Sequence, residues 1–197
     1  MTKSIKPLIL AILGLSVLLI ILQFFQNEIV YHRTNISEGQ WWRIITGNLI
    51  HSNYTHLALN LAGLWILGFL FIDSLKIKTF IFSIVFLCLI VGTGLYIYTP
   101  ELDVYYGFSG VLYGLFLIGA FSAILQHDYF TGISVALLLF FKVAWDLFKG
   151  GSLTSEKLIG IPVATDAHLY GVLGASLTCC LILIKTRLML KTGGGAM

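Results

Sequence analysis

Long apolar runs separated by short polar segments dominate the chain. Six runs stand out, at about residues 7–25, 55–72, 79–98, 109–125, 131–148 and 167–184. A helix needs roughly 20 mostly apolar residues to cross a bilayer. Inside the hydrocarbon such a run satisfies its backbone hydrogen bonds only as a helix, and these runs lack the polar–apolar alternation of barrel strands. The pattern predicts an all-α membrane protein with six transmembrane helices.

The composition leads to the same class of protein. Hydrophobic residues make up 58% of the 197 residues and charged residues only 11%, and the mean hydropathy is +0.94. Soluble domains carry about 25% charged residues. The six runs occupy most of the chain, which predicts one membrane domain over residues 1–197 and no soluble domain. The first run is long for a signal peptide and lacks a suitable cleavage site, so we expect it to be a retained span.

Basic residues are distributed unevenly between the two predicted sides of the membrane. Alternating the six spans places seven on one side, namely Lys3, Lys6, Lys76, Lys78, Lys185, Arg187 and Lys191. The other side receives five, namely Arg33, Arg43, Lys142, Lys149 and Lys157. By the positive-inside rule the first side is cytoplasmic. We therefore expect a multi-pass protein of the cell inner (plasma) membrane with both termini in the cytoplasm. The net charge of +3 reflects this topology and does not indicate nucleic-acid binding.

Two of the predicted extracytoplasmic segments are long. Residues 26–54 contain Trp41 and Trp42, and tryptophan favours the membrane interface. Segments of this length inside a compact domain are usually functional or partly structured, so we expect this one to lie in the outer leaflet. Residues 149–166 are rich in glycine and are expected to form a flexible outer loop.

Cysteine and histidine spacing gives no indication of a metal or a cofactor. Cys88, Cys179 and Cys180 all fall inside apolar runs, where free cysteines behave as small apolar residues. Adjacent cysteines are poor disulfide partners, and the chain has no CxxC motif. We expect no disulfide, no metal and no cofactor.

His56 and Asn60 lie four residues apart on the second span and therefore share one helix face. Gly63 continues that face. The pair offers hydrogen-bond donors at one depth in the membrane. The alternative interpretation is that both side chains only bind neighbouring helices.

Ser109 stands at the start of the fourth span, between Gly107 and Gly110. The free N–H groups and the dipole of a helix N-terminus favour negative charge there, which would suit an oxyanion. A serine that only caps the helix is the alternative. The motif is not the G-x-S-x-G elbow of soluble hydrolases, because Val111 stands where that motif has its second glycine.

His168 opens the sixth span, close to the small residues Gly171 and Ala175. Gly110 and Gly114 repeat the same spacing on the fourth span, and such pairs allow helix backbones to approach closely. We expect the two helices to pack together with Ser109 near His168. Tyr113, one turn below the serine, could support the imidazole ring. A hydroxyl, a base and oxyanion donors are the parts that acyl transfer requires.

Four motifs together resemble the rhomboid intramembrane serine proteases. They are "WWR" at 41–43, "HSNYTHLALN" at 51–60, "GFSG" at 107–110 with Tyr113, and "AHLYG" at 167–171. The resemblance extends from Trp42 to Ala175, where many family members have glycine. It implies a rhomboid-like bundle with a long first extracytoplasmic loop and a serine endopeptidase without a cofactor.

The resemblance also implies roles for individual residues. Ser109 and His168 would form a catalytic dyad, and the Ser109 N–H, His56 and Asn60 would form the oxyanion hole. Arg43 and His51 would hold the outer loop. The supporting positions would be Gly107, Gly110, Tyr113 and Gly171. Asp166 precedes His168 by two residues and would face away on a helix. Because the family uses a dyad, Asp166 is not included in the expected site.

Two segments are most similar to the rhombosortase branch, namely "RIITGNLIHSNYTHLALNLAGL" and "YGFSGVLYGL". That branch is associated with secreted proteins that carry a C-terminal GlyGly, a hydrophobic span and a basic cluster. We therefore expect cleavage of membrane-anchored proteins near the extracytoplasmic face. The alternatives are a general rhomboid protease of single-span substrates, a non-catalytic binder of membrane helices, and a small transporter with a histidine proton relay. The chain's own Gly193–Gly195 follows the last span and does not match such a signal.

The fifth span suggests a route for the substrate and contains one ion pair. Its aromatic residues, Phe140, Phe141, Trp145 and Phe148, predict a gate between the second and fifth spans. Aromatic residues that face lipid are the alternative. Lys142 and Asp146 lie four residues apart and are interpreted as an ion pair near the interface.

Overall fold

The computed structural model describes residues 6–193, with side chains to residue 184. Its helices are α1 (Pro7–Leu22), η1 (Gln23–Phe25), α2 (Gln26–Ile29), α3 (Arg33–Ser37), α4 (Arg43–Thr46), η2 (Gly47–Leu49), α5 (Tyr54–Leu70), α6 (Ile77–Tyr98), α7 (Ser109–Leu125), α8 (Tyr129–Lys149), α9 (Leu153–Ile159) and α10 (Thr165–Gly193). Its strands are β1 (Tyr31–His32) and β2 (Val104–Tyr105). Every apolar run is therefore helical along most of its length.

Within residues 6–193, four helical stretches are long and apolar enough to cross a membrane. They are Pro7–Ile29, Ile77–Tyr98, Tyr129–Lys149 and Thr165–Ile184. Helices α5 and α7 are also apolar but have 17 residues each, which is about 25 Å at the rise of an α-helix. The prediction of a helical membrane bundle is confirmed. That α5 and α7 also cross the membrane stays a prediction.

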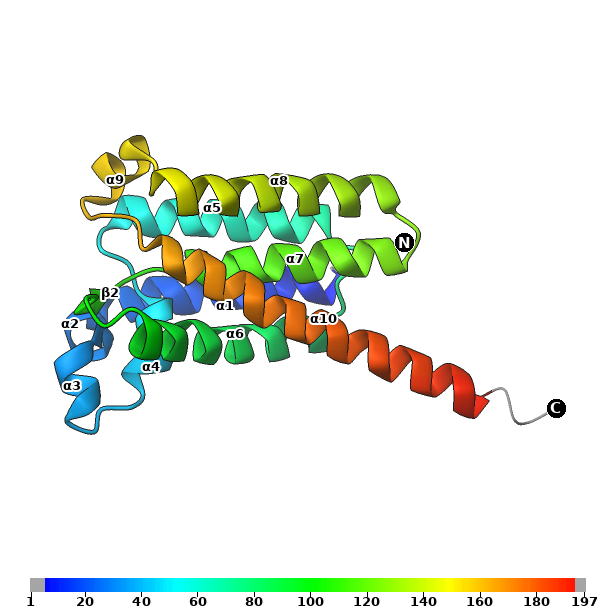
Figure 1. The fold of residues 1–197 in the computed structure, drawn as a ribbon, viewed down its shortest axis with the longest axis horizontal. Coiled ribbons are helices and arrows are strands. Elements are labelled where there is room, and N and C mark those ends of the chain that lie inside the picture. The colour runs from blue at the N-terminus through cyan, green and yellow to red at the C-terminus, as the bar shows by residue number, and fades with distance from the viewer. Residues whose placement is uncertain (1–5, 194–197) are drawn as a thin grey trace.

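Helix α7 lies at the centre of the bundle. It packs against α10, α8, α6 and α5. In Figure 1, α8 and α5 lie on one side of it, α1 and α6 lie on the other, and α10 crosses it obliquely. Val111, Leu115 and Ile118 along α7 are completely buried. Side chains of α7 are therefore fixed by packing from several directions, which makes it a rigid support for a site at its first residue.

The crossing of α7 and α10 depends on glycines on both helices. A Cβ on Gly171 would overlap the carbonyl oxygen of Gly110, and a Cβ on Gly110 would lie 2.7 Å from the carbonyl oxygen of Ala167. A Cβ on Gly114 would lie 2.7 Å from the carbonyl oxygen of Gly171. The two backbones are thus in direct contact, as the spacing of small residues predicts.

The segment before α5 is structured and lies at one end of the bundle. Strand β1 pairs antiparallel with β2, with Tyr31 opposite Tyr105, a pairing that the sequence pattern did not indicate. The Arg33 guanidinium donates hydrogen bonds to the carbonyls of Leu95, Tyr96, Thr99 and Leu102, which satisfies the C-terminal end of α6. These contacts join the first long segment to the α6–α7 connection. Its position in the outer leaflet stays a prediction.

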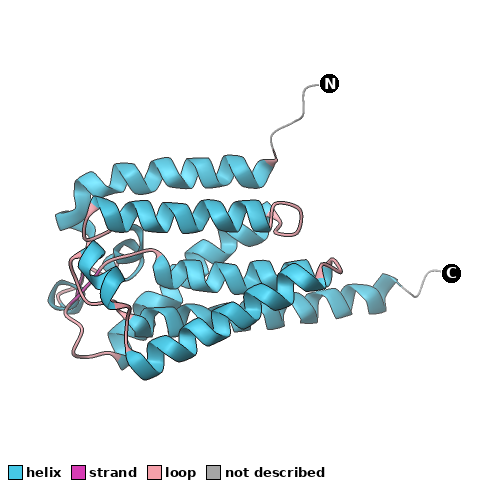
Figure 2. Ribbon diagram, turned by 90° about the horizontal axis from the view of Figure 1, so that it is seen from above, coloured by secondary structure: helices cyan, strands magenta, loops and turns pink. Residues whose placement is uncertain are grey.

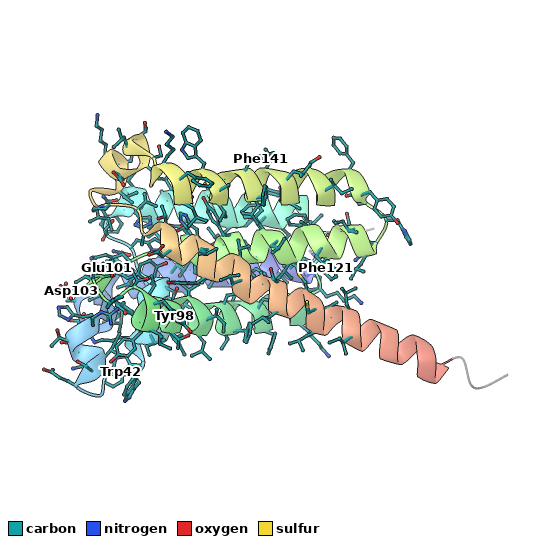
Figure 3. The ribbon with its side chains drawn as sticks, viewed as in Figure 1. Trp42, Tyr98, Glu101, Asp103, Phe121 and Phe141 are labelled. Atoms are coloured by element: carbon teal, nitrogen blue, oxygen red, sulfur yellow. The ribbon has the colours of Figure 1, made fainter. Side chains whose placement is uncertain are left out.

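The buried Arg43 side chain stabilises the segment before α5 through hydrogen bonds within it. It donates to the Val30 carbonyl at 2.7 Å and to Gln40 Oε1 at 2.6 Å. Trp42 is more than half exposed and lies with Glu101 and Asp103 at the end of the bundle where α3 and α4 gather (Figure 3). Helix α1 begins and α10 ends toward the opposite end (Figures 1 and 2).

Residues 149–166 contain a helix that the sequence analysis missed. Helix α9 begins after Ser152, whose hydroxyl accepts a hydrogen bond from the Ser155 N–H. It ends at Gly160, which has a left-handed φ of 76°, a conformation that glycine adopts at little cost. The expectation of a loop along the whole segment is wrong, because a serine cap and a glycine stop fold its middle into two turns.

His51 is an unusual buried group in the connection before α5. Its side chain has no exposed surface, and neither ring nitrogen has a hydrogen-bond partner among the described residues. Its backbone is held by Gln23, which donates to the His51 carbonyl and accepts from the His51 N–H. Burial, followed by repulsion from His56, lowers the pKa of His51 to about 3. The ring is therefore neutral at physiological pH and acts as a packing group.

The substitution Gly171→Ala tests the contact between α7 and α10. The new methyl group must push the helices apart, and overpacking of this kind costs about 1–3 kcal/mol of stability. We expect a lower midpoint of thermal unfolding in detergent. Gly14→Ala is the matched control, because a Cβ on Gly14 of α1 meets no atom within 4 Å. Equal midpoints for the two variants would show that the crossing tolerates a wider spacing.

The buried imidazole of His51 predicts a loss of stability in acid. Its folded-state pKa, about 3, is below the unfolded value of about 6.5, so the unfolded chain binds the extra proton. This contribution to stability is present above about pH 6.5 and falls toward pH 3, by up to about 1.4 kcal/mol per pH unit. His51→Phe should therefore lose less stability than the parent between about pH 7 and pH 4. Parallel pH curves for the two proteins would contradict this assignment.

Candidate active site

Ser109 is the first residue of α7, and the chain before it is held in one conformation. Gly107 has a φ of 120°, which side-chain-bearing residues rarely adopt. A Cβ there would also lie 2.8 Å from the His56 ring. The Tyr105 hydroxyl donates to the Gly107 carbonyl at 2.8 Å. The serine is therefore placed by a fixed turn, and the residue is half-buried.

His168, one turn into α10, lies against the serine. Its Nε2 is 3.1 Å from Ser109 Oγ, and only 4% of the residue surface is exposed. The Tyr113 ring stacks on the imidazole, with the centroids 4.0 Å apart and the planes 9° from parallel. The Tyr113 ring therefore covers one face of the imidazole. A hydroxyl and a ring nitrogen within hydrogen-bond distance are the geometry that a nucleophile and its general base need.

Asp146 of α8 contacts the other nitrogen of the same ring. Asp146 Oδ2 is 3.0 Å from His168 Nδ1, and the aspartate is 1% exposed. The predicted ion pair between Asp146 and Lys142 is present. From the sequence, Lys142 was the one partner expected for Asp146, and the contact with His168 was not predicted. A carboxylate inside an apolar span was a signal, since ionisable groups there are usually functional.

Asp166 takes no part in this cluster. Its Oδ2 accepts from the Thr99 hydroxyl at 3.3 Å, and the same hydroxyl lies 3.1 Å from the Tyr170 hydroxyl. Asp166, which is close to His168 in sequence, therefore connects α10 to the end of α6. The carboxylate that contacts the imidazole is Asp146, 22 residues before His168.

His56 and Asn60 of α5 lie on the wall of the cavity that also contains Ser109 and His168. His56 Nδ1 is 3.2 Å from the Ser52 hydroxyl, so this contact restrains the ring. The Asn60 amide donates to the His56 carbonyl at 3.1 Å, which leaves its second N–H uncommitted among these contacts. An amide carries two donors, so Asn60 can serve a second acceptor.

The cavity has a volume of about 540 Å³ and is lined by α5, α7, α8, α9 and α10. Its polar groups gather around Ser109, and its remaining wall is mostly leucine and isoleucine. A second cavity of about 40 Å³ shares Ser109 and His56 with the first, and Tyr106 and Pro162 also line it. An apolar cavity of this size with a few converging polar groups is typical of a binding site for an apolar chain.

The four aromatic residues proposed as a gate do not line the cavity. Phe140, Phe141, Trp145 and Phe148 are between 59% and 86% exposed, and Phe141 projects outward from α8 (Figure 3). The α8 side chains that face the cavity are Val135, Leu138, Leu139 and Lys142. The aromatic gate is therefore wrong, because these positions point away on the helix, as lipid-facing residues do. Access between α5 and α8 stays a prediction.

The predicted site residues fall into two groups. Those at the cavity are Ser109, His168, His56, Asn60 and Tyr113, with Gly107, Gly110 and Gly171 behind them. Arg43 lies apart, in the α2–α4 segment, and His51 contacts the His56 ring edge to face at 5.0 Å. Within the described residues, no three histidine, cysteine or acidic side chains are grouped so that they could hold a metal.

Comparison with known proteins gives two findings. The rhomboid domain family matches residues 38–185. The chain is also 25% identical over 167 residues, 82% of its length, to the Bacillus subtilis (strain 168) protein named "Putative rhomboid protease YdcA", of which 77% is covered. The family match extends over most of the chain and includes every residue of the cluster around Ser109. The chain is therefore a multi-pass membrane protein that belongs to the rhomboid family.

Proposed function

We propose that this protein is an intramembrane serine protease that cleaves membrane-anchored proteins near the extracytoplasmic face. The observation that carries the proposal is the 3.1 Å approach of Ser109 Oγ to His168 Nε2 at the polar end of an apolar cavity. Membership of the rhomboid family and the similarity to a protein named as a rhomboid protease support it.

The chemistry proceeds in two steps. Ser109 Oγ attacks the scissile carbonyl carbon while its proton passes to His168 Nε2. When the tetrahedral intermediate collapses, the C–N bond breaks and the same proton goes to the leaving amine, which leaves an acyl group on Ser109. Water then attacks the ester carbonyl and gives a proton to His168. Cleavage of the C–O bond returns that proton to Ser109 and releases the carboxylic acid.

The oxyanion of each intermediate needs fixed hydrogen-bond donors. The Ser109 N–H belongs to the first turn of α7, where N–H groups have no partner within the helix. His56 and Asn60 line the same cavity, and the Asn60 amide has a second N–H besides the one that donates to the His56 carbonyl. Donors held in place before the reaction stabilise developing charge without reorganising. We infer that these three groups form the oxyanion hole.

The proposed membrane topology rests on the distribution of basic residues and on the lengths of the helices. We infer six spans, with α5 and α7 crossing at about 25 Å each and both termini in the cytoplasm by the positive-inside rule. Helix α1 begins and α10 ends at one end of the bundle, and the α2–α4 segment gathers at the other (Figure 1). Ser109 and His168 begin their helices near that second end, so water would reach them from the extracytoplasmic side.

The substrate class is the finer part of the proposal. The motifs around His56 and Ser109 are most similar to the rhombosortase branch, which implies substrates with a GlyGly followed by a hydrophobic span and a basic cluster. The mostly apolar wall of the cavity suits a hydrophobic segment, and small residues before the span would pass the crowded end beside Ser109. Equal cleavage of single-span proteins with and without GlyGly would instead assign a general rhomboid protease.

Substitution of Ser109 by alanine tests the nucleophile. With the protein in lipid vesicles and a GlyGly-tailed anchored substrate, Ser109→Ala should lose about 10⁵–10⁶-fold in rate and should no longer react with a fluorophosphonate. Ser122→Ala is the matched control, because Ser122 lies on the same helix and only donates to the Ile118 carbonyl. Cleavage by the parent and by Ser109→Ala at the same rate would refute the assignment. Substrate binding without cleavage by either protein would favour a non-catalytic helix binder.

Substitution of His56 or Asn60 by alanine tests the oxyanion hole. Loss of one donor lowers kcat by about 10²–10³-fold, and KM should change little because the donors act on the intermediate. His127→Ala serves as the control, since His127 is exposed in the α7–α8 turn. If both cavity variants keep the kcat of the parent, His56 and Asn60 only hold helices together.

A further inference from the structure

Asp146 is a buried carboxylate whose oxygens are occupied by three side chains. Oδ1 pairs with the Lys142 ammonium. Oδ2 faces His168 Nδ1 at 3.0 Å and the Tyr113 hydroxyl at 3.4 Å. Only 1% of the aspartate is exposed. Burial of a charge is costly unless it is paired and hydrogen-bonded, so a position that supplies three donors indicates a specific role.

Only one neutral tautomer of His168 can form hydrogen bonds with both Asp146 and Ser109. A carboxylate accepts hydrogen bonds and donates none, so His168 Nδ1 must carry the proton. In the neutral ring Nε2 then holds the lone pair and faces Ser109 Oγ at 3.1 Å. This is the tautomer that accepts the serine proton. Asp146 thus fixes both the direction of the ring and the nitrogen that acts as base.

We propose that Asp146, held by Lys142, is a positioning residue that orients His168 and stabilises its charged form, so that Ser109, His168 and Asp146 work as a triad. The proposal rests on the proposed protease function and extends the dyad expected from the sequence. The titratable groups around the imidazole are Asp146 and Lys142 on α8, Tyr113 on α7 and His56 on α5.

The arrangement of Lys142 supports this role over that of a simple ion pair. The Lys142 side chain is 47% exposed whereas Asp146 is 1% exposed, so the ammonium reaches the buried carboxylate from the side that water can enter. Its ammonium also lies 5.9 Å from the centre of the Tyr113 ring, the same ring that stacks on His168. Lys142 and Tyr113 together restrict Asp146 and the imidazole to one geometry, which an ion pair alone would not require.

Asp146→Asn tests the proposal with little change in shape. The asparagine amide would donate to His168 Nδ1 and favour the tautomer with the proton on Nε2, which cannot accept from Ser109. We expect kcat to fall by about 10³–10⁴-fold with KM nearly unchanged, and the rate of fluorophosphonate labelling of Ser109 to fall similarly. Asp166→Asn is the matched control, since Asp166 is bound to Thr99 and should keep the parent rate.

A spectroscopic measurement separates a positioning role from a purely structural one. In protein labelled with ¹⁵N-histidine and reconstituted in nanodiscs, the His168 ring-nitrogen shifts of the parent should report a protonated Nδ1 and a bare Nε2. Assignment uses the signal lost in His168→Gln. Asp146→Asn should exchange the two. A purely structural role predicts a lower unfolding midpoint with the tautomer and the labelling rate per folded molecule unchanged, and this result would overturn the proposal.

The outcomes also distinguish this proposal from the protease assignment. Activity of Asp146→Asn within about threefold of an active parent, beside an inactive Ser109→Ala, would overturn the triad and leave the protease. A parent that neither cleaves nor labels would overturn the protease, while its tautomer would still report whether Asp146 orients His168. If Asp146→Asn does not fold, the parent spectrum decides, because a protonated Nε2 there contradicts the proposal.

Discussion

Direct contact between the backbones of α7 and α10 is the constraint on which the whole site depends. Ser109 and His168 come from helices that are far apart in the chain, and their side chains are short. They meet at 3.1 Å only because Gly110 and Gly171 bring the helix axes close enough for carbonyl oxygens to occupy the space of a side chain. Ordinary interaxial distances are 8–10 Å, and the small-residue contact lies at the close end of helix packing.

Side chains from α5, α7 and α8 surround the His168 imidazole and orient it toward Ser109. Helix α8 supplies Asp146 on the far side of the imidazole, α7 supplies the Tyr113 ring on its face, and α5 closes the opposite wall with His56. Each of these side chains stands on a regular helix within a packed bundle. Sites built on such elements hold their geometry better than sites on loops, and the one loop that matters, before Ser109, is fixed by the φ of Gly107 and by the Tyr105 hydroxyl.

The sequence was sufficient for the helices and for the meeting of Ser109 with His168, because apolar length and small-residue spacing are local signals. It was insufficient where orientation mattered. Asp146 had an obvious partner four residues away, and nothing local shows that α8 also faces His168. The aromatic residues of the same helix were misplaced because aromatic side chains in a span occur both on faces that meet lipid and on faces that meet protein. Strands β1 and β2 have two residues each, too few to form a pattern, and the cap of α9 is hidden among glycines.

The shortness of α5 has a consequence for the lipid around the protein. At about 25 Å it is shorter than a hydrocarbon core of about 30 Å, and its Phe69 side chain, which does not line the cavity, is 65% exposed. If α5 spans the bilayer as proposed, a mismatch of about 5 Å falls on the helix that lines the cavity, and lipid beside it would thin to cover the helix. The acyl-chain length of the surrounding lipid would then act on the same flank as the proposed access between α5 and α8.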